Sequence, residues 1–154
     1  MKCHLVQQSK QKLDSVFKLV ESLPDDPETK AHWARYLCVL VSGFIENSVR
    51  TLYIEYAQNK SAPYVSAYVA RNIGQFQNPK MQSIVNLAHS FSAAWGKELQ
   101  DGTEGELKAA IDTVVSNKNN IAHGKDVQIT FIGIKTYYAR AWKVLEMIDA
   151  HCNR

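Results

Sequence analysis

A short stretch between two apolar helical patterns gathers several residue types that can carry out chemistry. Residues 116–126 read "SNKNNIAHGKD" and contain Lys118, His123 and two adjacent amides, Asn119 and Asn120. Histidine titrates near neutral pH, so His123 is suited to take up or release a proton. The ammonium of Lys118 is suited to hold a phosphate, or to stabilise negative charge that builds up on one.

Together these groups are the kind needed for cleavage of RNA without a metal. A base removes the proton of a 2′-hydroxyl group, the oxygen attacks the neighbouring phosphate, and a cation stabilises the crowded intermediate. The product is a 2′,3′-cyclic phosphate. We expect neither a metal nor a cofactor, because the sequence has no HExxH or CxxC motif. The remaining histidines are isolated from one another in sequence: His4, His32, His89 and His151.

The same stretch also has a purely structural interpretation. Asparagine and glycine are common where helices end, and Gly124 permits the left-handed backbone that releases the chain. Lysine and histidine near a helix C-terminus interact favourably with its dipole, by roughly 0.3–1 kcal/mol each. The spacing alone therefore leaves open whether residues 118–124 end a helix, form a site, or do both.

The surrounding sequence predicts helices and little else. Apolar residues recur at three- and four-residue spacing, which is typical of amphipathic helices. The expected helices cover about 2–23, 28–59 and 63–76, a fourth that begins near 79, one that fades at 117–120, and one that begins near 130. Thr103 and Glu106 have the spacing of a capping box. Residues 90–102 suggest a helical turn or two, and residues 126–133 a brief extended segment.

Composition places few further limits on this chain. A length of 154 residues, 45% of them hydrophobic, fits one domain over residues 1–154. The net charge of +3 permits an anionic partner without requiring one. The longest apolar run, residues 36–45, is about half of what a bilayer needs, so we expect a buried helix and no membrane partner. Three widely spaced cysteines favour the reducing cytoplasm. The expected fold is all-α, an up-and-down bundle of five to six helices.

Three segments of the chain resemble HEPN domains. "KNNIAHG", residues 118–124, is similar to the HEPN signature Arg-Asn-x-x-x-His, and closest to the RiboL-PSP-HEPN branch, where it often reads RNxIAHG. "SGFIENSVRTLY", residues 42–53, and "KTYYARAWKVLEMID", residues 135–149, resemble the second and the closing helix of that branch. The resemblance covers most of the chain and is most specific at the signature.

This resemblance implies a helical bundle that forms homodimers, in which two signatures meet at the interface and make one composite cleft. Many members of the superfamily are metal-independent endoribonucleases that act as toxins of toxin–antitoxin pairs or in defence against phage. Others have lost catalysis and bind RNA or a partner protein. The expected partners are therefore a second copy, RNA and, for a toxin, a cognate antitoxin.

Three residues match the signature position by position. His123 matches the catalytic histidine, and Asn119 matches the polar residue after the arginine. Lys118 stands where the family has arginine, so the charge is kept while the planar fork that grips two phosphate oxygens is lost. The departure leaves two alternatives open, an endoribonuclease and a weak or inactive module that binds RNA or a protein.

Four further residues are candidates for supporting roles. Glu46 and Arg50 lie four apart on the second expected helix, acid first, which favours a pair. HEPN proteins often place a polar or acidic residue of this helix near the motif, so Glu46 is a candidate to orient Lys118 or His123, and Arg50 to supply a guanidinium. The alternative is an ordinary salt bridge. Asn120 and Tyr138 are candidates for RNA contact, although the apolar seam around Tyr138 favours core packing.

Overall fold

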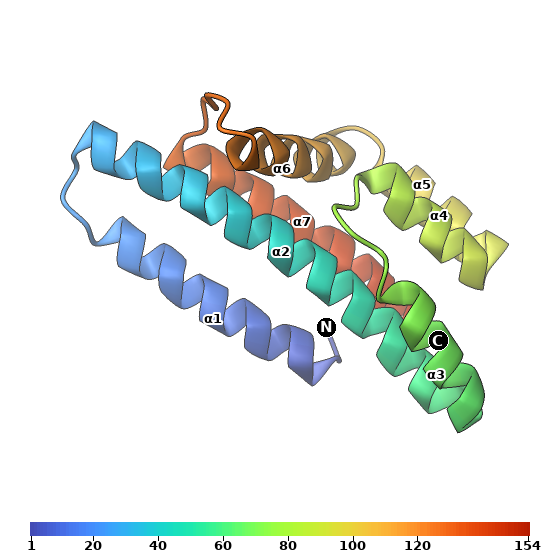
Figure 1. Cartoon of the computed structure of the whole chain (residues 1–154). Coiled ribbons are helices and arrows are strands. Elements are labelled where there is room, and N and C mark those ends of the chain that lie inside the picture. Colours follow the sequence, from blue (N-terminus) through green and yellow to red (C-terminus); the bar gives the residue numbers. More distant parts are fainter.

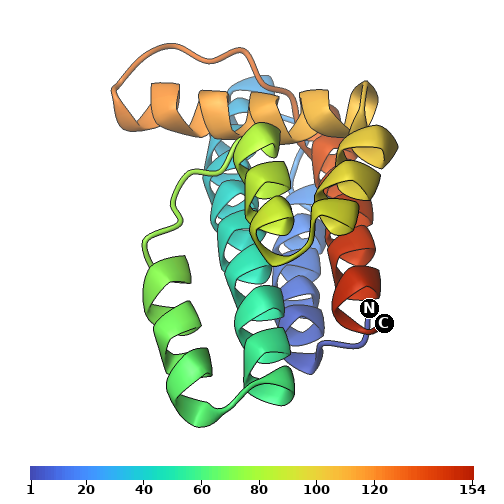
Figure 2. The ribbon, with the colours of Figure 1, turned by 90° about the vertical axis from the view of Figure 1, so that its right-hand side faces the viewer.

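A computed structural model describes residues 1–154 and contains seven helices and no strand. The helices are α1 (His4–Glu21), α2 (Pro27–Lys60), α3 (Pro63–Ile73), α4 (Met81–Phe91), α5 (Ala93–Thr103), α6 (Glu106–Ala122) and α7 (Phe131–Cys152). α2 packs between α1 and α7, and α6 crosses α2 and α7 (Figures 1 and 2). The all-α expectation is confirmed, but seven helices replace the expected five to six. The crossing of α6 also departs from a simple up-and-down bundle.

The extra helix arises at a single residue. Ser92 is extended, with φ −158° and ψ 127°, and its Oγ accepts a hydrogen bond from the backbone N–H of Trp95 at 3.4 Å. This serine ends α4 and caps α5, so residues 90–102, expected to form a helical turn or two, contain the end of α4 and nearly all of α5. The predicted capping box at Thr103 is wrong, because α5 continues through that residue. Gly105, with φ 89°, precedes α6 instead.

The long helix α2 forms the centre of the molecule. Asp26 caps it by accepting from Thr29 N at 2.9 Å, and Pro27 occupies its first position. By length and composition alone α2 is long and apolar enough to span a membrane. However, 56% of the residues in its most apolar stretch are buried in the bundle. Such burial is typical of a core helix, as the sequence predicted for residues 36–45.

The segment between α6 and α7 forms an irregular loop. Its residues make no strand, although Thr130 is extended, and residues 131–133 of the expected extended segment belong to α7. Val127 and Ile129 are nonetheless buried, at 6% and 8% exposure, and anchor this loop to the core. The anchored loop connects the end of α6 to the start of α7, where Thr130 accepts a cap bond from Gly133 N at 3.0 Å.

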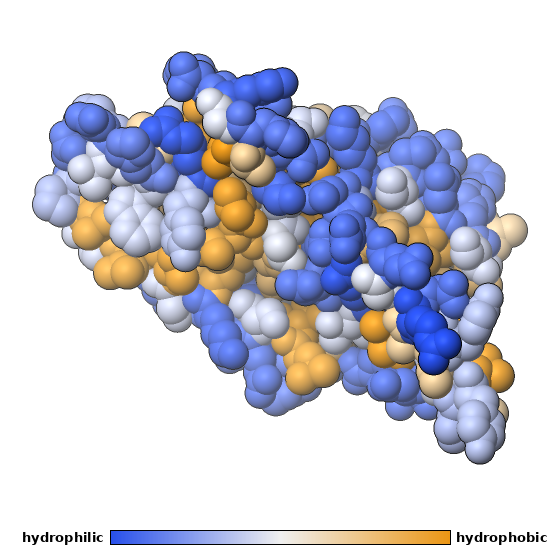
Figure 3. All heavy atoms as spheres, in the orientation of Figure 1, coloured by the Kyte–Doolittle hydropathy of each residue, from blue (hydrophilic) through white to orange (hydrophobic).

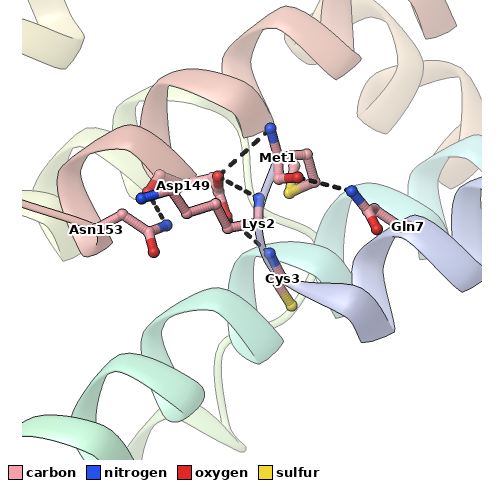
Figure 4. Close-up of polar contacts among 6 residues, drawn as sticks. All are labelled: Met1, Lys2, Cys3, Gln7, Asp149 and Asn153. Carbon is pink, nitrogen blue, oxygen red and sulfur yellow. Dashed lines mark hydrogen bonds and ion pairs between the residues drawn. The ribbon is translucent and has the colours of Figure 1, made fainter.

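A buried carboxylate fastens the start of the chain to α7 (Figure 4). The Oδ atoms of Asp149 accept from the backbone N–H groups of Lys2 and Cys3 at 2.7 and 3.2 Å. The Met1 amine lies 3.6 Å from the same carboxylate. Burial raises the pKa of Cys3 to about 11 and that of Cys152, in the last turn of α7, to about 12. Both thiols are therefore expected to stay protonated at neutral pH.

Candidate functional site

The signature stretch lies at the C-terminal end of α6, and a glycine ends the helix. His123 is the C-cap, and Gly124 follows with φ 70°. The backbone N–H of Gly124 donates to Ile121 O at 3.1 Å, and that of Lys125 to Asn120 O at 2.9 Å. These two bonds define a Schellman motif. The helix thus runs two residues beyond the expected fading point, and the structural interpretation holds for Gly124 and the backbone of Asn120.

His123 and Asn119 share one face of the helix end. They lie four positions apart, where side chains of a helix are neighbours. The imidazole is exposed and makes no hydrogen bond within the chain, whereas Asn119 is half-buried. Asn120, at the next position, is also half-buried. The imidazole is therefore free to meet an incoming group, with an amide beside it.

Lys118 is held by a residue from another part of the chain. Its Nζ donates to Asn78 Oδ1 at 2.5 Å, and Asn78 lies in the loop between α3 and α4. The backbone N–H of Asn78 in turn donates to Glu46 Oε2 at 2.6 Å. An ammonium, an amide and a carboxylate thus connect α6, the loop and α2. The network fixes the direction of the lysine side chain.

Glu46 and Arg50 form the predicted pair on α2, and both are engaged in the same network. Arg50 Nη2 lies 3.1 Å from Glu46 Oε1, with both side chains about one-fifth exposed. Arg50 Nε also donates to Phe76 O at 2.7 Å, which ties the α3–α4 loop to α2. Glu46 reaches Lys118 only through Asn78 and makes no hydrogen bond to His123. The guanidinium of Arg50 interacts with the loop, through Phe76 O, and with Glu46.

The arrangement provides a proton acceptor and a cation at the end of one helix. A lysine ammonium has three N–H donors, and Asn78 takes one, so the others can reach a phosphate. The amide leaves the positive charge of Lys118 uncompensated, unlike a carboxylate partner. The chain has no group of three or more His, Cys, Asp or Glu side chains placed to hold a metal ion.

The sequence model of the RiboL-PSP-HEPN family matches residues 6–154. The chain belongs to this family. RiboL-PSP-HEPN members are predicted ribonucleases, and HEPN domains typically dimerise and bind RNA. No curated protein and no solved structure matches the chain significantly. Within the HEPN fold described here, the signature ends the penultimate helix, α6, and α7 closes the bundle.

One candidate of the HEPN site, Tyr138, lies elsewhere in the molecule. Its side chain is only 7% exposed and stacks on Phe17 at a centroid distance of 4.9 Å. Its hydroxyl donates to Asp14 Oδ1 of α1 at 2.8 Å. Burial and this carboxylate raise the pKa of Tyr138 well above its ordinary value. In the structure Tyr138 is therefore a core residue, as the alternative interpretation expected, and the geometry gives no support to an RNA contact.

Asn78 is the site residue that the sequence did not reveal. Its φ of 46° lies in the left-handed region, which asparagine tolerates better than most residues. The Asn78–Pro79 dipeptide does mark a turn. The dipeptide does not indicate which residue contacts Asn78, because Lys118 lies 40 residues further along the chain.

Proposed function

We propose that this HEPN domain is an endoribonuclease that cleaves RNA without a metal, by attack of a 2′-hydroxyl group on the adjacent phosphate. The observation that carries the proposal is the end of α6, where an exposed imidazole follows a lysine whose side chain is fixed by Asn78 and Glu46. A fixed cation stabilises charge in a transition state without the cost of reorganising it. The membership of a family of predicted ribonucleases agrees with this chemistry.

Each signature residue has a role in this mechanism. His123 takes the 2′-hydroxyl proton as general base. Lys118 faces the phosphate and stabilises the negative charge of the pentacoordinate intermediate. Asn119, on the same helix face as His123, orients the imidazole or donates to a phosphate oxygen. Asn120 lies beside it as a further polar contact, and Glu46 acts through Asn78 as a positioning residue.

The complete site requires two copies of the chain. One protomer supplies one imidazole, whereas the reaction needs a base and then an acid for the leaving 5′-oxygen, and a two-fold dimer supplies both. An open apolar groove of about 370 Å³ offers a surface for the second copy. Val16 of α1 and Val39, Leu40 and Gly43 of α2 contribute to its lining, and Figure 3 shows apolar surface over this part of α2.

The biological setting follows from the same proposal. We place the protein in the reducing cytoplasm, where its three free thiols would remain reduced. An RNase of this kind would act as a toxin or a phage-defence effector, with a cognate antitoxin or another partner protein to restrain it.

Cleavage of a labelled RNA by purified protein in EDTA tests the proposal. The wild-type protein should produce fragments with 2′,3′-cyclic phosphate ends. His123→Ala should slow cleavage by about 10²–10⁴-fold, the usual contribution of general acid–base catalysis. His4→Ala, which changes an exposed histidine of α1, is the matched control. Equal rates for the wild type and His123→Ala would remove His123 from the mechanism.

A second function is favoured by one observation, the lysine in place of the signature arginine. A HEPN module with weak or no catalysis would bind RNA or a partner protein through the same surface. Lys118→Arg separates the two, because it restores the planar fork without changing charge. Cleavage that appears only in Lys118→Arg would establish the natural protein as a binding module. Cleavage by the wild type at a comparable rate would establish the enzyme.

A further inference from the structure

An open groove separates α3 from α4, away from the signature. α3 makes its main contacts with α2, and it stands apart from α4 in Figure 2. The groove between them has a volume of about 690 Å³. Its lining is mostly apolar and includes Tyr68, Val69 and Ile73 of α3, Phe76 of the loop, and Leu87 and Phe91 of α4. A groove of this size and lining is large enough for an unpaired base.

Two tyrosines of α3, one of which lines the groove, are exposed to an unusual degree. Tyr64 is 91% exposed and Tyr68 is 68% exposed. They lie four positions apart on α3, so their rings are neighbours on one helix face, and Arg71 continues that face one turn later. The two rings are outside the core, and a cation lies next to them on the same helix face. Exposed aromatic rings beside a cation are typical of a surface on which unpaired bases stack.

The stretch of chain that forms this groove carries charged side chains of one sign only. No aspartate or glutamate occurs between Glu55 and Glu98, whereas this interval contains Lys60, Arg71, Lys80 and Lys97. Every residue that lines the groove belongs to the interval. The carboxylate of Asp112, which comes from α6, is occupied by the backbone N–H of Met81 at 2.8 Å. The apolar lining suits planar, apolar groups of a ligand, and the nearby cations suit a negatively charged backbone. A polyanion with planar side groups has both features.

The loop at the end of the groove is also part of the signature network. Phe76 lines the groove, and its carbonyl oxygen accepts from Arg50 Nε at 2.7 Å. Two residues later Asn78 accepts from Lys118. One short loop therefore forms the wall of the groove and holds the signature lysine. A strand that leaves the groove along this loop arrives at Lys118.

We propose that the α3–α4 groove binds single-stranded RNA and directs it to the signature. Bases stack on Tyr64 and Tyr68 and enter the groove, while Arg71 and Lys80 contact phosphates. The inference rests on the proposed function, because it assigns that site its substrate class, an unpaired strand rather than a duplex. The inference also goes beyond the proposed function, because it adds a binding surface formed by α3 and α4.

The test measures RNA affinity separately from cleavage. The probe is a fluorescent oligouridylate of about twelve nucleotides, a length that spans a typical single-strand site, and binding is followed by anisotropy in a His123→Ala background. The double change Tyr64→Ala and Tyr68→Ala should weaken binding at least roughly tenfold, since each stacked base contributes about 1–3 kcal/mol. Arg71→Gln should weaken binding and reduce its dependence on salt. Duplex RNA of the same length should bind more weakly than the single strand.

Matched controls and two assays make the outcomes separable. Tyr36→Ala changes another exposed tyrosine, at 53% exposure on α2, and Lys18→Gln another exposed cation, on α1; both should bind as the parent does. Unchanged binding by the α3 variants, or equal affinity for duplex RNA, would overturn the inference. So would a change of sedimentation in the α3 double variant, which would make this face a protein interface. Lost binding in that variant, with no cleavage by wild type, supports the groove while removing the proposed catalysis.

Discussion

The partner of Lys118 determines what the lysine can do. An amide holds the ammonium by one hydrogen bond and leaves its full charge for a phosphate. The carboxylate of Glu46 contacts the backbone of Asn78 and the side chain of Arg50, so it stiffens the network without pairing with the lysine. A lysine that is fixed in this way recovers part of the preorganisation that an arginine fork would bring.

Asn78→Asp tests this view, because aspartate has nearly the same shape and also tolerates the left-handed backbone. The new carboxylate would pair with Lys118 and lie beside Glu46, so it would compete with phosphate. RNA affinity and cleavage rate should each fall roughly tenfold or more, in line with the strength of hydrogen bonds to charged groups. Anisotropy and a gel-based cleavage assay measure the two quantities. Gln11→Glu adds the same charge at an exposed position of α1, and an equal loss there would show a general charge effect.

At the scale of elements, the end of α6 serves the fold and the site together. Gly124 ends the helix, and the side chain at its C-cap, His123, is thereby presented to solvent. An added Cβ at Gly124 would meet nothing within 4 Å. The need for glycine is therefore conformational and not steric, since only the φ of 70° opposes another residue.

Gly124→Ala should lower the free energy of unfolding by about 1 kcal/mol, the cost of a left-handed backbone for a residue with a Cβ. Urea unfolding followed by circular dichroism measures the change. The substitution would also move His123, the C-cap residue. The rate of RNA cleavage should therefore fall by more than the loss of folded protein explains. His123→Ala provides the contrast, with cleavage lost and the unfolding curve nearly unchanged. A Gly124→Ala protein as stable as wild type would contradict the assigned cap.

The sequence was a good guide wherever the decisive interaction is local. Apolar spacing predicted α1, α2, α6 and α7 within a few residues, because one buried stripe is enough to define an amphipathic helix. It failed at Ser92 and Gly105, where only one or two non-helical residues separate neighbouring helices. Such breaks depend on packing between the helices as much as on the residue, so periodicity cannot locate them.

The same distinction applies to the candidate site. The pair of Glu46 and Arg50 could be predicted because the two residues are four apart on one helix. The contact of Lys118 with Asn78 spans 40 residues, and that of Tyr138 with Asp14 spans 124. Contacts between residues so far apart in sequence exist only once the chain has folded. They determine that Lys118 joins the network with Asn78 and that Tyr138 packs in the core.

At the scale of the molecule, the two proposed surfaces occupy different elements. The apolar groove for a second copy lies between α1 and the middle of α2, whereas the groove for RNA lies between α3 and α4. α3 follows the C-terminal end of α2 (Figure 1). A dimer formed through α2 would therefore leave each α3–α4 groove open. Two bound strands, or one strand that passes between protomers, would then be compatible with a central pair of signatures.

Val39→Asp tests the dimer, since Val39 lines the α1–α2 groove at 36% exposure. In a two-fold interface the new carboxylate is introduced twice, and a buried charge without a partner is strongly unfavourable. Sedimentation velocity at micromolar concentration should show a dimer for wild type and a monomer for Val39→Asp. Cleavage should fall on the order of a hundredfold, because the monomer lacks the second imidazole. Val65→Asp, at 52% exposure on α3, should remain dimeric. A monomeric Val39→Asp that cleaves at the wild-type rate would place the whole site within one chain.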